Sequence, residues 1–308
     1  MILDILLIII GITLVLVGAD RLTEGASALA RRFGVPEIVI GLTIVACGTS
    51  APEFFVSLMS ALNGTPDMAV GNVVGSNTMN AMLIVGCAAM VAPMVISHST
   101  VKKDIPFSVG ASLALILLTY DSVISRLDGI ILILGFVFFM AYTLKQVKGA
   151  KPESTEVKQQ NAWLSAGWII LGLAGLVFGS NLFVGSASNV ASSLGVSEGV
   201  IGLTIVAGGT SLPELATSVV AARKGQSAIA IGNVIGSNVF NILLILGVTS
   251  AITPLQIQGV TLLDIGVMLG SITLVWLFCF TRYTVERWEG AALTVGYLAY
   301  VGWLLSNV

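Results

Sequence analysis

The chain has 308 residues, of which 56% are hydrophobic and only 10% are charged. A soluble domain carries roughly 25% charged residues, so this composition excludes a soluble globular protein and indicates a chain surrounded by membrane lipid. The net charge of −2 says nothing about partners. The sequence implies neither a nucleic acid nor a protein partner.

Apolar segments of about 20 residues are needed to cross the hydrocarbon core of a bilayer. The sequence contains ten candidates, and their continuous apolar character favours helices over the alternating strands of a membrane barrel. We therefore expect an all-α, polytopic membrane protein with ten transmembrane helices. In chain order, the predicted spans are 3–19, 38–61, 69–92, 105–120, 129–144, 164–187, 199–222, 228–250, 262–280 and 290–306.

The basic residues predict how these spans are oriented. When the loops are numbered along the chain, 13 of the 14 Lys and Arg residues fall on one side, and Arg126 alone falls on the other. Lys and Arg are retained in cytoplasmic loops. We therefore predict a multi-pass protein of the cell membrane, with both termini external and the polar loop 145–160 cytoplasmic. The composition of that loop is typical of a linker.

An internal repeat relates the two halves of the chain. With a shift of 161 residues, 18–86 aligns with 179–247 without a gap, and 34 of 69 positions are identical. Five predicted spans separate each residue from its copy, so the two copies cross the membrane in opposite directions. Inverted repeats of this kind build many secondary transporters, whose sites lie near the bilayer midplane between the repeats.

The repeat divides the chain into an N-terminal five-helix half, 1–144, and a C-terminal five-helix half, 161–308. The repeat motifs themselves are 39–86 and 200–247, and the loop 145–160 joins the halves. Duplication alone could also build a symmetrical bundle without a site. That alternative is disfavoured because the most similar positions are polar ones at membrane depth, where polarity is costly.

A carboxylate stands in apolar sequence in each copy of the repeat. Glu53 ends the run "VIGLTIVACGTSAPE", and Glu214 ends the run "VIGLTIVAGGTSLPE". An ionisable residue inside a membrane span indicates a functional site by default. The plainer interpretation is a protonated Glu that bridges two helices, and it is weaker for a symmetrical pair than for one residue.

A proline precedes each of these glutamates. Pro52 and Pro213 have no N–H to donate to the carbonyl four residues earlier, so the helix is expected to open there. The freed carbonyls lie at about 46–49 and 207–210. Irregular backbone at this depth is tolerated only where protein or a water-filled cavity surrounds it. A bound cation is a ready partner for such carbonyls.

Hydroxyl and amide oxygens accompany both carboxylates. Positions i, i+1 and i+4 share one side of a helix, which groups Thr49 and Ser50 with Glu53, and Thr210 and Ser211 with Glu214. The small residues in "GNVVGSN" (71–77) and "GNVIGSN" (232–238) allow the next helix to approach closely. That approach is expected to bring Ser76, Asn77 and Asn80 against Glu53, and Ser237, Asn238 and Asn241 against Glu214.

Together these groups predict a cage made of oxygen ligands. Hard cations such as Ca2+ take six to eight oxygens, and the cage contains neither the His nor the Cys that zinc, copper or iron would want. Na+ is close to Ca2+ in size, whereas Mg2+ loses its waters reluctantly. As plainer interpretations, the Ser and Thr hydroxyls bond their own helices, and Asn77 and Asn238 only hold helices together.

The paired motifs "GTSAPE…GNVVGSN…N" and "GTSLPE…GNVIGSN…N" resemble the two α-repeats of the sodium/calcium exchanger family, within the cation/Ca2+ antiporter superfamily. The resemblance covers both halves and implies exchange of external Na+ for cytosolic Ca2+, with no cofactor and no enzyme chemistry. It also implies a set of ligands, with backbone carbonyls completing the sites: Glu53, Glu214, Thr49, Ser50, Ser76, Asn80, Thr210, Ser211, Ser237, Asn241, Ala46 and Ala207.

Several alternatives stay open at this point. Many family members have an Asp at one of the positions matched by Asn80 and Asn241, and Asn at both positions makes K+ co-transport less expected. Ca2+/H+ exchange is the close rival, since a Glu can exchange a proton for a metal. A cation channel is more distant, because channels usually place identical subunits around an axis. An enzyme is disfavoured by the lack of any HExxH or GxSxG motif.

Overall fold

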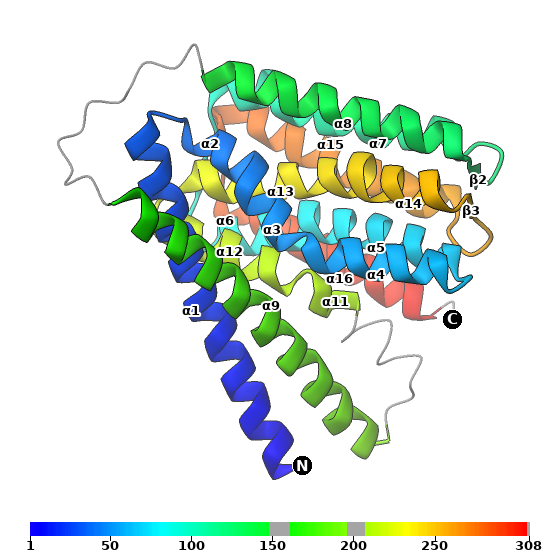
Figure 1. Cartoon of the computed structure of the whole chain (residues 1–308), viewed down its shortest axis with the longest axis horizontal. Coiled ribbons are helices and arrows are strands. Elements are labelled where there is room, and N and C mark those ends of the chain that lie inside the picture. The colour runs from blue at the N-terminus through cyan, green and yellow to red at the C-terminus, as the bar shows by residue number, and fades with distance from the viewer. Residues whose placement is uncertain (148–160, 196–206, 307–308) are drawn as a thin grey trace.

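The computed structural model describes residues 1–147, 161–195 and 207–306, and Figure 1 shows that these residues fold almost wholly as helices. The described residues of the predicted spans are helical except at the breaks Ser50 and Ser211 and at the span ends 92 and 119–120, so the all-α architecture is confirmed. From residue 148 on, the predicted linker lies outside the described residues, as do the first seven residues of the second repeat motif.

The N-terminal half contains long helices interrupted by short stretches of the wider π-helical turn, which are labelled η. Its elements are α1 (Ile2–Phe33), α2 (Glu37–Ile40), η1 (Gly41–Val45), α3 (Ala46–Thr49), α4 (Ala51–Leu62), α5 (Pro66–Met79), η2 (Asn80–Ile84), α6 (Val85–Val91), β1 (Met94–Val95), η3 (Thr100–Asp104), α7 (Ile105–Leu118), β2 (Val123–Ile124) and α8 (Arg126–Val147).

The C-terminal half follows the same order over its described residues. Its elements are α9 (Ala162–Ser193), α11 (Ala207–Thr210), α12 (Leu212–Arg223), α13 (Ser227–Val239), η5 (Phe240–Leu246), α14 (Gly247–Ile252), β3 (Leu255–Gln256), α15 (Leu262–Arg282), β4 (Thr284–Val285) and α16 (Arg287–Ser306).

Local sequence signals set several helix ends. Gly34 ends α1 in the left-handed conformation, at φ 62°, which glycine adopts without steric cost. Pro66 opens α5, where a missing N–H loses nothing. Thr261 and Asp264 form a reciprocal capping box at the start of α15, with Asp264 Oδ2 accepting from Thr261 N at 2.9 Å.

Six helices are long and apolar enough to cross a membrane within the described ranges, and a seventh crossing is added if one bent pair counts as a single span. The bent pair joins Glu37–Thr49 to Ala51–Leu62 at an angle of 47°. The fold is therefore that of a polytopic helical membrane protein. The count of ten crossings stays a prediction, because some predicted spans contain shorter or only partly described helices.

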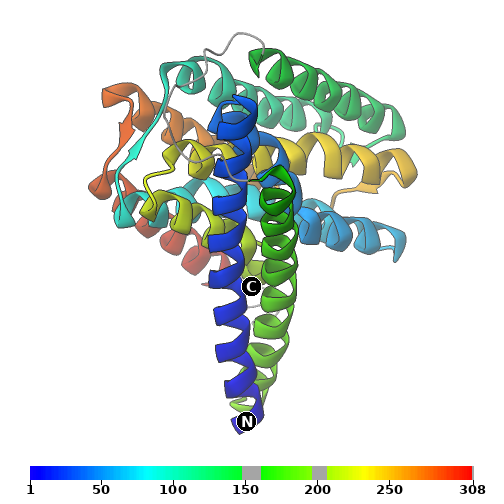
Figure 2. The same cartoon turned by 60° about the vertical axis from the view of Figure 1, so that its left-hand side comes forward.

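Helices α1 and α9 form an antiparallel pair, which we call the α1–α9 rod. A Cβ added to Gly11, Gly18 or Gly25 of α1 would lie within 2.8 Å of a carbonyl oxygen of α9, at Gly179, Gly172 and Ser165 respectively. Glycine at every seventh position thus allows the two backbones to touch. Figures 1 and 2 both show the rod running obliquely to the other helices and extending beyond them.

The remaining helices form the body, which two short antiparallel strand pairs tie together. Strand β1 pairs with β4, and Met94 lies opposite Val285. Strand β2 pairs with β3, and Val123 lies opposite Gln256. Each pair therefore joins a loop of one half to a loop of the other half.

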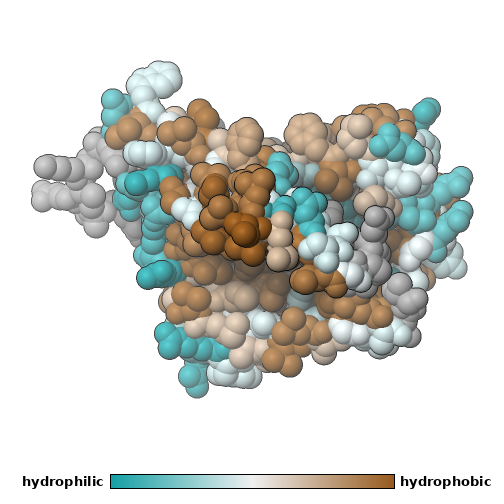
Figure 3. All heavy atoms as spheres, turned by 90° about the horizontal axis from the view of Figure 1, so that it is seen from below, coloured by the Kyte–Doolittle hydropathy of each residue, from teal (hydrophilic) through white to brown (hydrophobic). Residues whose placement is uncertain are grey.

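The surface seen from below is apolar across its middle and polar toward its two ends. Figure 3 shows brown atoms filling the middle of this face, with teal atoms gathered at the left and right. Large apolar side chains of both rod helices are exposed, among them Ile9 at 56% and Phe178 at 71%. This is the distribution of a surface whose middle band faces lipid tails.

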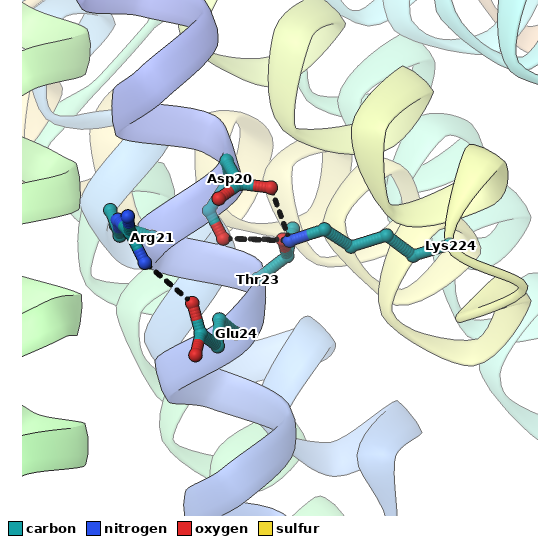
Figure 4. Close-up of polar contacts among 5 residues, drawn as sticks. All are labelled: Asp20, Arg21, Thr23, Glu24 and Lys224. Atoms are coloured by element: carbon teal, nitrogen blue, oxygen red, sulfur yellow. Dashed lines mark hydrogen bonds and ion pairs between the residues drawn. The ribbon is translucent and has the colours of Figure 1, made fainter.

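The rod is longer than the sequence predicted, and this corrects the first span. Helix α1 continues through the charged residues that follow position 19, so Asp20, Arg21 and Glu24 lie on the helix instead of in a loop. Lys224, which caps α12, donates to the Asp20 carbonyl at 2.9 Å and pairs with its carboxylate at 2.7 Å (Figure 4). The rod is therefore tied to the body at this point.

Candidate cation site

Two broken helices meet at the centre of the body. Ser50 separates α3 from α4 with φ −82° and ψ 6°, and Ser211 separates α11 from α12 with φ −89° and ψ 7°. In each case the break precedes the proline by two residues, as the missing proline N–H predicts. The breaks place the starts of α4 and α12, with Glu53 and Glu214 in their first turns, at the centre of the protein.

Both carboxylates are buried and bound by a serine from the opposite half. Glu53 and Glu214 each expose only 1% of their surface. Ser211 Oγ donates to Glu53 Oε1 at 3.0 Å, and Ser50 Oγ donates to Glu214 Oε1 at 2.9 Å. The two halves therefore exchange their serines, and neither carboxylate is surrounded by its own half alone.

This crossing corrects the grouping expected from helical spacing. The sequence placed Ser50 beside Glu53 and Ser211 beside Glu214, on one side of the same helix. The break at each serine turns its hydroxyl away from its own glutamate and toward the other. Ser211 Oγ also lies 3.2 Å from Ser76 Oγ, so Ser76 too contacts the opposite half.

Four asparagines form a second crossed layer beside the carboxylates. Asn80 Nδ2 donates to Asn238 Oδ1 at 3.0 Å, and Asn241 Nδ2 donates to Asn77 Oδ1 at 2.9 Å. Asn77 Nδ2 in turn donates to the backbone carbonyl of Asn238 at 3.1 Å. All four side chains are at most 2% exposed. The amide N–H groups of Asn80 and Asn241 are thus directed at the opposite half.

Several buried oxygens of this cluster have no hydrogen-bond partner among the described residues. They are Glu53 Oε2, Glu214 Oε2, Asn80 Oδ1, Asn241 Oδ1 and Ser237 Oγ. Carboxylate and amide oxygens can only accept, and leaving such groups buried and unpaired is costly. A bound cation is one partner that buried oxygens of this kind take. We call this set of oxygens the cage.

Two of the remaining predicted ligands, Thr49 and the Ala46 carbonyl, have hydrogen-bond partners in the structure. Thr49 Oγ1 donates to Asn233 Oδ1 at 3.0 Å, which joins α3 to α13. The Ala46 carbonyl, expected to be freed, accepts from Ser50 N at 3.0 Å, so the break leaves this hydrogen bond intact. Its second lone pair also faces Thr49 Oγ1, at 3.4 Å. Thr210 ends α11, and Ala207 begins it.

Two asparagines that the sequence did not assign to the site hold the broken helices in place. Asn72 Nδ2 donates to the Glu53 carbonyl at 3.2 Å and to Ser57 Oγ at 2.9 Å. Asn233 Nδ2 makes the equivalent bonds to the Glu214 carbonyl and to Ser218. The sequence did contain a signal for these two residues, because each is the Asn of a repeated "GN" pair. The glycine spacing of the same motif predicted only close helix packing.

The rod lies directly against both broken helices. A Cβ on Gly48 would lie 2.3 Å from a Leu173 methyl group, and one on Gly209 would lie 2.0 Å from a Val184 methyl group. Beside this contact is a cavity of about 380 Å3, lined by Ala51, Pro52, Phe55, Val56, Val177, Ser180, Asn181, Val184, Gly209 and Thr210. A space next to the cage is thus bordered by α9 of the rod.

The donor chemistry of the cage suits a hard cation. The unpartnered atoms of the cage are all oxygens, from carboxylates, amides and one hydroxyl. Transition metals prefer nitrogen and sulfur ligands. A ligand set of two carboxylates with neutral amide and hydroxyl oxygens is suited to Ca2+ or Na+.

Comparison with known proteins agrees with these features. The sequence model of a family described as "Sodium/calcium exchanger protein" matches residues 3–145 and, again, residues 164–306. The inner membrane protein YrbG of Escherichia coli is 37% identical over 97% of this chain and 95% of its own. The sodium/calcium exchanger MaX1 of Methanosarcina acetivorans is 32% identical over 96% of this chain and 97% of its own.

The fold also matches solved structures of one exchanger under several ion conditions. A structure of the sodium-calcium exchanger NCX_Mj soaked with zero Na+ and Ca2+ aligns with a TM-score of 0.87 and 31% identity, over 98% of this chain and 99% of that one. Soaks of the same exchanger with Na+ and with Sr2+ align equally well, with a TM-score of 0.87 for 10 mM Na+ and 10 mM Sr2+.

Proposed function

The chain belongs to the sodium/calcium exchanger protein family, and we propose that it exchanges Na+ for Ca2+ across the cell membrane by alternating access, exporting Ca2+. The observation that carries this proposal is the cage of buried oxygens. Two carboxylate oxygens and two amide oxygens, supplied equally by the two halves, have no partner among the described residues.

The cage also explains how the two ion fluxes are coupled. Glu53 and Glu214 each use one oxygen for a serine of the opposite half and keep the other for an ion. The two carboxylates neutralise one Ca2+, or share several Na+ with the amide and hydroxyl oxygens. Ca2+ and Na+ both need the same two carboxylates, so binding of one ion excludes binding of the other. That exclusion couples the entry of one ion to the exit of the other.

The ligand set proposed for this site is that predicted from the sequence. Glu53 and Glu214 are the central ligands, and the support for each of the others is its place around the cage. The supporting ligands are Asn80, Asn241, Thr49, Ser50, Thr210, Ser211, Ser76, Ser237 and the carbonyls of Ala46 and Ala207.

The ten-helix inverted arrangement is part of the same proposal, with halves 1–144 and 161–308 and the linker 145–160 between them. The double match to the family model supports these halves. In this arrangement the rod is the mobile element, because its spans 3–19 and 164–187 lie outside the repeat motifs 39–86 and 200–247. Its sliding over the cage, along the contacts at Gly48 and Gly209, would open the cavity beside Thr210 to one side of the membrane or the other.

The contacts between loops support the predicted alternation of the spans, and the charge rule then orients them with both termini external and the linker cytoplasmic. The charge rule puts the loops containing β1 and β4 on the cytoplasmic side, and those two strands pair. It puts the loops containing β2 and β3 on the external side, and those two pair as well. A wrong span count would have placed paired loops on opposite sides.

The test is uptake of radioactive Ca2+ into proteoliposomes that contain the purified protein. Vesicles are loaded with Na+, K+ or choline at a clamped pH and diluted into Ca2+. Uptake that requires internal Na+ is the expected result. A further requirement for K+ would assign the chain to K+-dependent exchange, and uptake driven by a pH gradient without Na+ would assign it to Ca2+/H+ exchange. Single-channel currents would overturn exchange altogether.

A further inference from the structure

A chain of hydrogen bonds runs from a backbone carbonyl of one half to the cage. The Asn238 carbonyl, at the end of α13, accepts from Asn77 Nδ2 at 3.1 Å. Asn77 Oδ1 accepts from Asn241 Nδ2 at 2.9 Å. The other end of the Asn241 amide, Oδ1, is one of the cage oxygens without a partner among the described residues.

The direction of this chain is fixed at its first link. A backbone carbonyl can only accept a hydrogen bond, so Asn77 must present its N–H to Asn238 and its oxygen to Asn241. An amide oxygen also only accepts, so Asn241 must present its N–H to Asn77. The Asn241 oxygen is then left pointing into the cage. Each orientation follows from the one before it.

The alternative orientations leave buried groups unpaired. Reversing Asn77 would set its oxygen against the Asn238 carbonyl and its N–H against the N–H of Asn241. Both asparagine side chains are 1% exposed, and buried polar groups without partners are costly because water cannot replace them.

The orientation of the Asn241 side-chain amide matters because one end of the amide attracts a cation and the other end repels it. The amide oxygen is a ligand, whereas the N–H2 group is the positive end of the dipole and repels a cation. An Asp at this position would need no such control, because its two carboxylate oxygens are equivalent. A protein with Asn at position 241 therefore binds a cation better when a neighbouring residue fixes the orientation of the Asn241 amide.

We propose that Asn77 is a positioning residue, which acts across the two halves to hold the Asn241 oxygen toward the cation bound between them. This rests on the proposed function, because it assumes that the cage binds Ca2+ or Na+. Asn77 itself does not touch the ion. Its own anchor is the Asn238 carbonyl, so the oxygen presented by η5 is set jointly by α5 and α13.

The first measurement is Ca2+ binding to the purified full-length protein, by titration calorimetry, for wild type and for Asn77→Leu. Leu has similar volume and cannot hydrogen-bond, so the Asn241 amide becomes free to rotate. The expected result is Ca2+ binding that is weaker by up to about tenfold, the upper end of what one hydrogen bond between neutral groups contributes. Unchanged binding would overturn the proposal.

The decisive measurement repeats Asn77→Leu in an Asn241→Asp background. A carboxylate presents an oxygen in either orientation, so the loss caused by Asn77→Leu should shrink to less than about threefold. A merely structural role for Asn77 would give the same loss in both backgrounds, because the effects of independent substitutions add. Equal losses would therefore overturn the proposal.

Asn72→Leu is the matched control. This substitution also removes a polar amide next to the cage. The hydrogen-bond partners of Asn72 are the Glu53 carbonyl and Ser57 Oγ, and these bonds do not involve Asn241. Its effect on Ca2+ affinity should be the same in both backgrounds. If Asn77→Leu does not fold, Asn77→Ser replaces it, because a hydroxyl can donate or accept and so no longer dictates the Asn241 orientation.

Failure of the proposed function can be told apart from failure of this inference. If the wild type binds Ca2+ but shows no Na+-driven uptake, the exchange reaction is wrong, and the two-background comparison still decides the role of Asn77. If the wild type binds neither Ca2+ nor Na+, both are wrong. If the wild type exchanges the ions and the two backgrounds lose affinity equally, only the role of Asn77 is wrong.

Discussion

Each carboxylate of the cage is divided between two tasks. One oxygen of Glu53 and of Glu214 accepts from a serine of the opposite half, and the other has no partner among the described residues. The serine therefore fixes the carboxylate while leaving it free to bind. Two kinds of substitution can therefore be compared. One removes the negative charge of a glutamate, and the other removes the serine hydroxyl that holds the carboxylate in place.

Removal of one charge is expected to abolish effective Ca2+ binding. Glu53→Gln and Glu214→Gln keep the size of the side chain and its acceptor oxygen but leave the cage with a single carboxylate. Ca2+ affinity depends on the number of charged ligands, so we expect Na+-driven uptake at low Ca2+ to fall by at least about tenfold for each variant. Normal uptake by Glu53→Gln would mean that the cage is not the ion site.

Removal of one crossed hydroxyl is expected to weaken Ca2+ binding while both charges stay in place. Ser50→Ala frees Glu214 Oε1, and Ser211→Ala frees Glu53 Oε1. A hydrogen bond to a charged group contributes about 1.5–3 kcal/mol, so the half-saturating Ca2+ concentration in the uptake assay should rise by about tenfold or more.

The control for the two serines is Ser112→Ala. Ser112 Oγ is equally buried but donates at 3.0 Å to Ser108 O of its own helix, α7. Its loss should leave the Ca2+ concentration dependence unchanged. If Ser50→Ala behaves like this control, the crossed hydroxyls contribute only to packing.

At the scale of elements, the rod and the body are held by different means. Within the rod, glycines at every seventh position bring two backbones into contact. Between rod and body, the Lys224 ammonium contacts Asp20 and also donates to Thr23 Oγ1 at 3.1 Å (Figure 4). Backbone contact resists separation, whereas a half-exposed ion pair is weak. The two helices of the rod should therefore move together.

A side chain introduced between the rod helices should destabilise the protein. A Cβ at position 18 would lie 2.7 Å from Gly172 O, so Gly18→Leu must push α1 and α9 apart. Overpacking typically costs about 1–3 kcal/mol, and we expect a lower melting temperature in detergent. Gly167→Leu, on α9 where nothing lies within 4 Å, is the control and should melt like the wild type. Equal melting of the two variants would show that the rod is loosely packed.

Removal of the tie between rod and body should change how fast the rod moves and leave the fold unchanged. Lys224→Met removes the ion pair with Asp20, which crosses from body to rod. Partly exposed pairs are worth about 0.2–1 kcal/mol, so the exchange rate should change by up to about fivefold while the melting temperature stays nearly constant.

The control for Lys224 is Glu24→Gln, which breaks a pair that lies wholly within α1. Arg21 Nη1 and Glu24 Oε2 are 3.0 Å apart, three residues from each other on the same helix. This pair moves with the rod, so its loss should not alter the exchange rate. A rate change in both variants would indicate a general effect of surface charge.

At the scale of the whole molecule, the orientation can be tested through exposed loop positions. We expect Tyr120→Cys, in the loop before β2, to react with a membrane-impermeant maleimide on intact cells, and Phe33→Cys, at the end of α1, to react only after lysis. Both native side chains are well exposed, at 85% and 62%. The native cysteines at 47, 87 and 279 are first replaced by Ala. The reverse labelling pattern would invert the predicted topology.

The sequence predicted the helical fold and the helix openings beside Glu53 and Glu214, because apolar length and a repeated Pro-Glu pair are local signals. It did not predict which serine binds which glutamate. That pairing depends on the direction in which Ser50 and Ser211 turn at the helix breaks, which tertiary contacts decide. The extension of α1 to Phe33 was missed for a similar reason, since its charged face is stabilised by Lys224, more than 200 positions away in the sequence.

The length of the rod has a consequence for the surrounding bilayer. Helices α1 and α9 have 32 residues each and are therefore about 48 Å long, whereas the hydrocarbon core is about 30 Å thick. Because α1 is charged from Asp20 on, its apolar part, 2–19, is about 27 Å long and close to the thickness of the core. The rod runs obliquely to the body helices (Figure 2), and its tilt decides how well this apolar part matches the core. Any sliding that changes this tilt also changes the bilayer thickness that the protein prefers. The acyl-chain length of the surrounding lipid should therefore change the exchange rate, because the bilayer thickness opposes or favours the tilting of the rod.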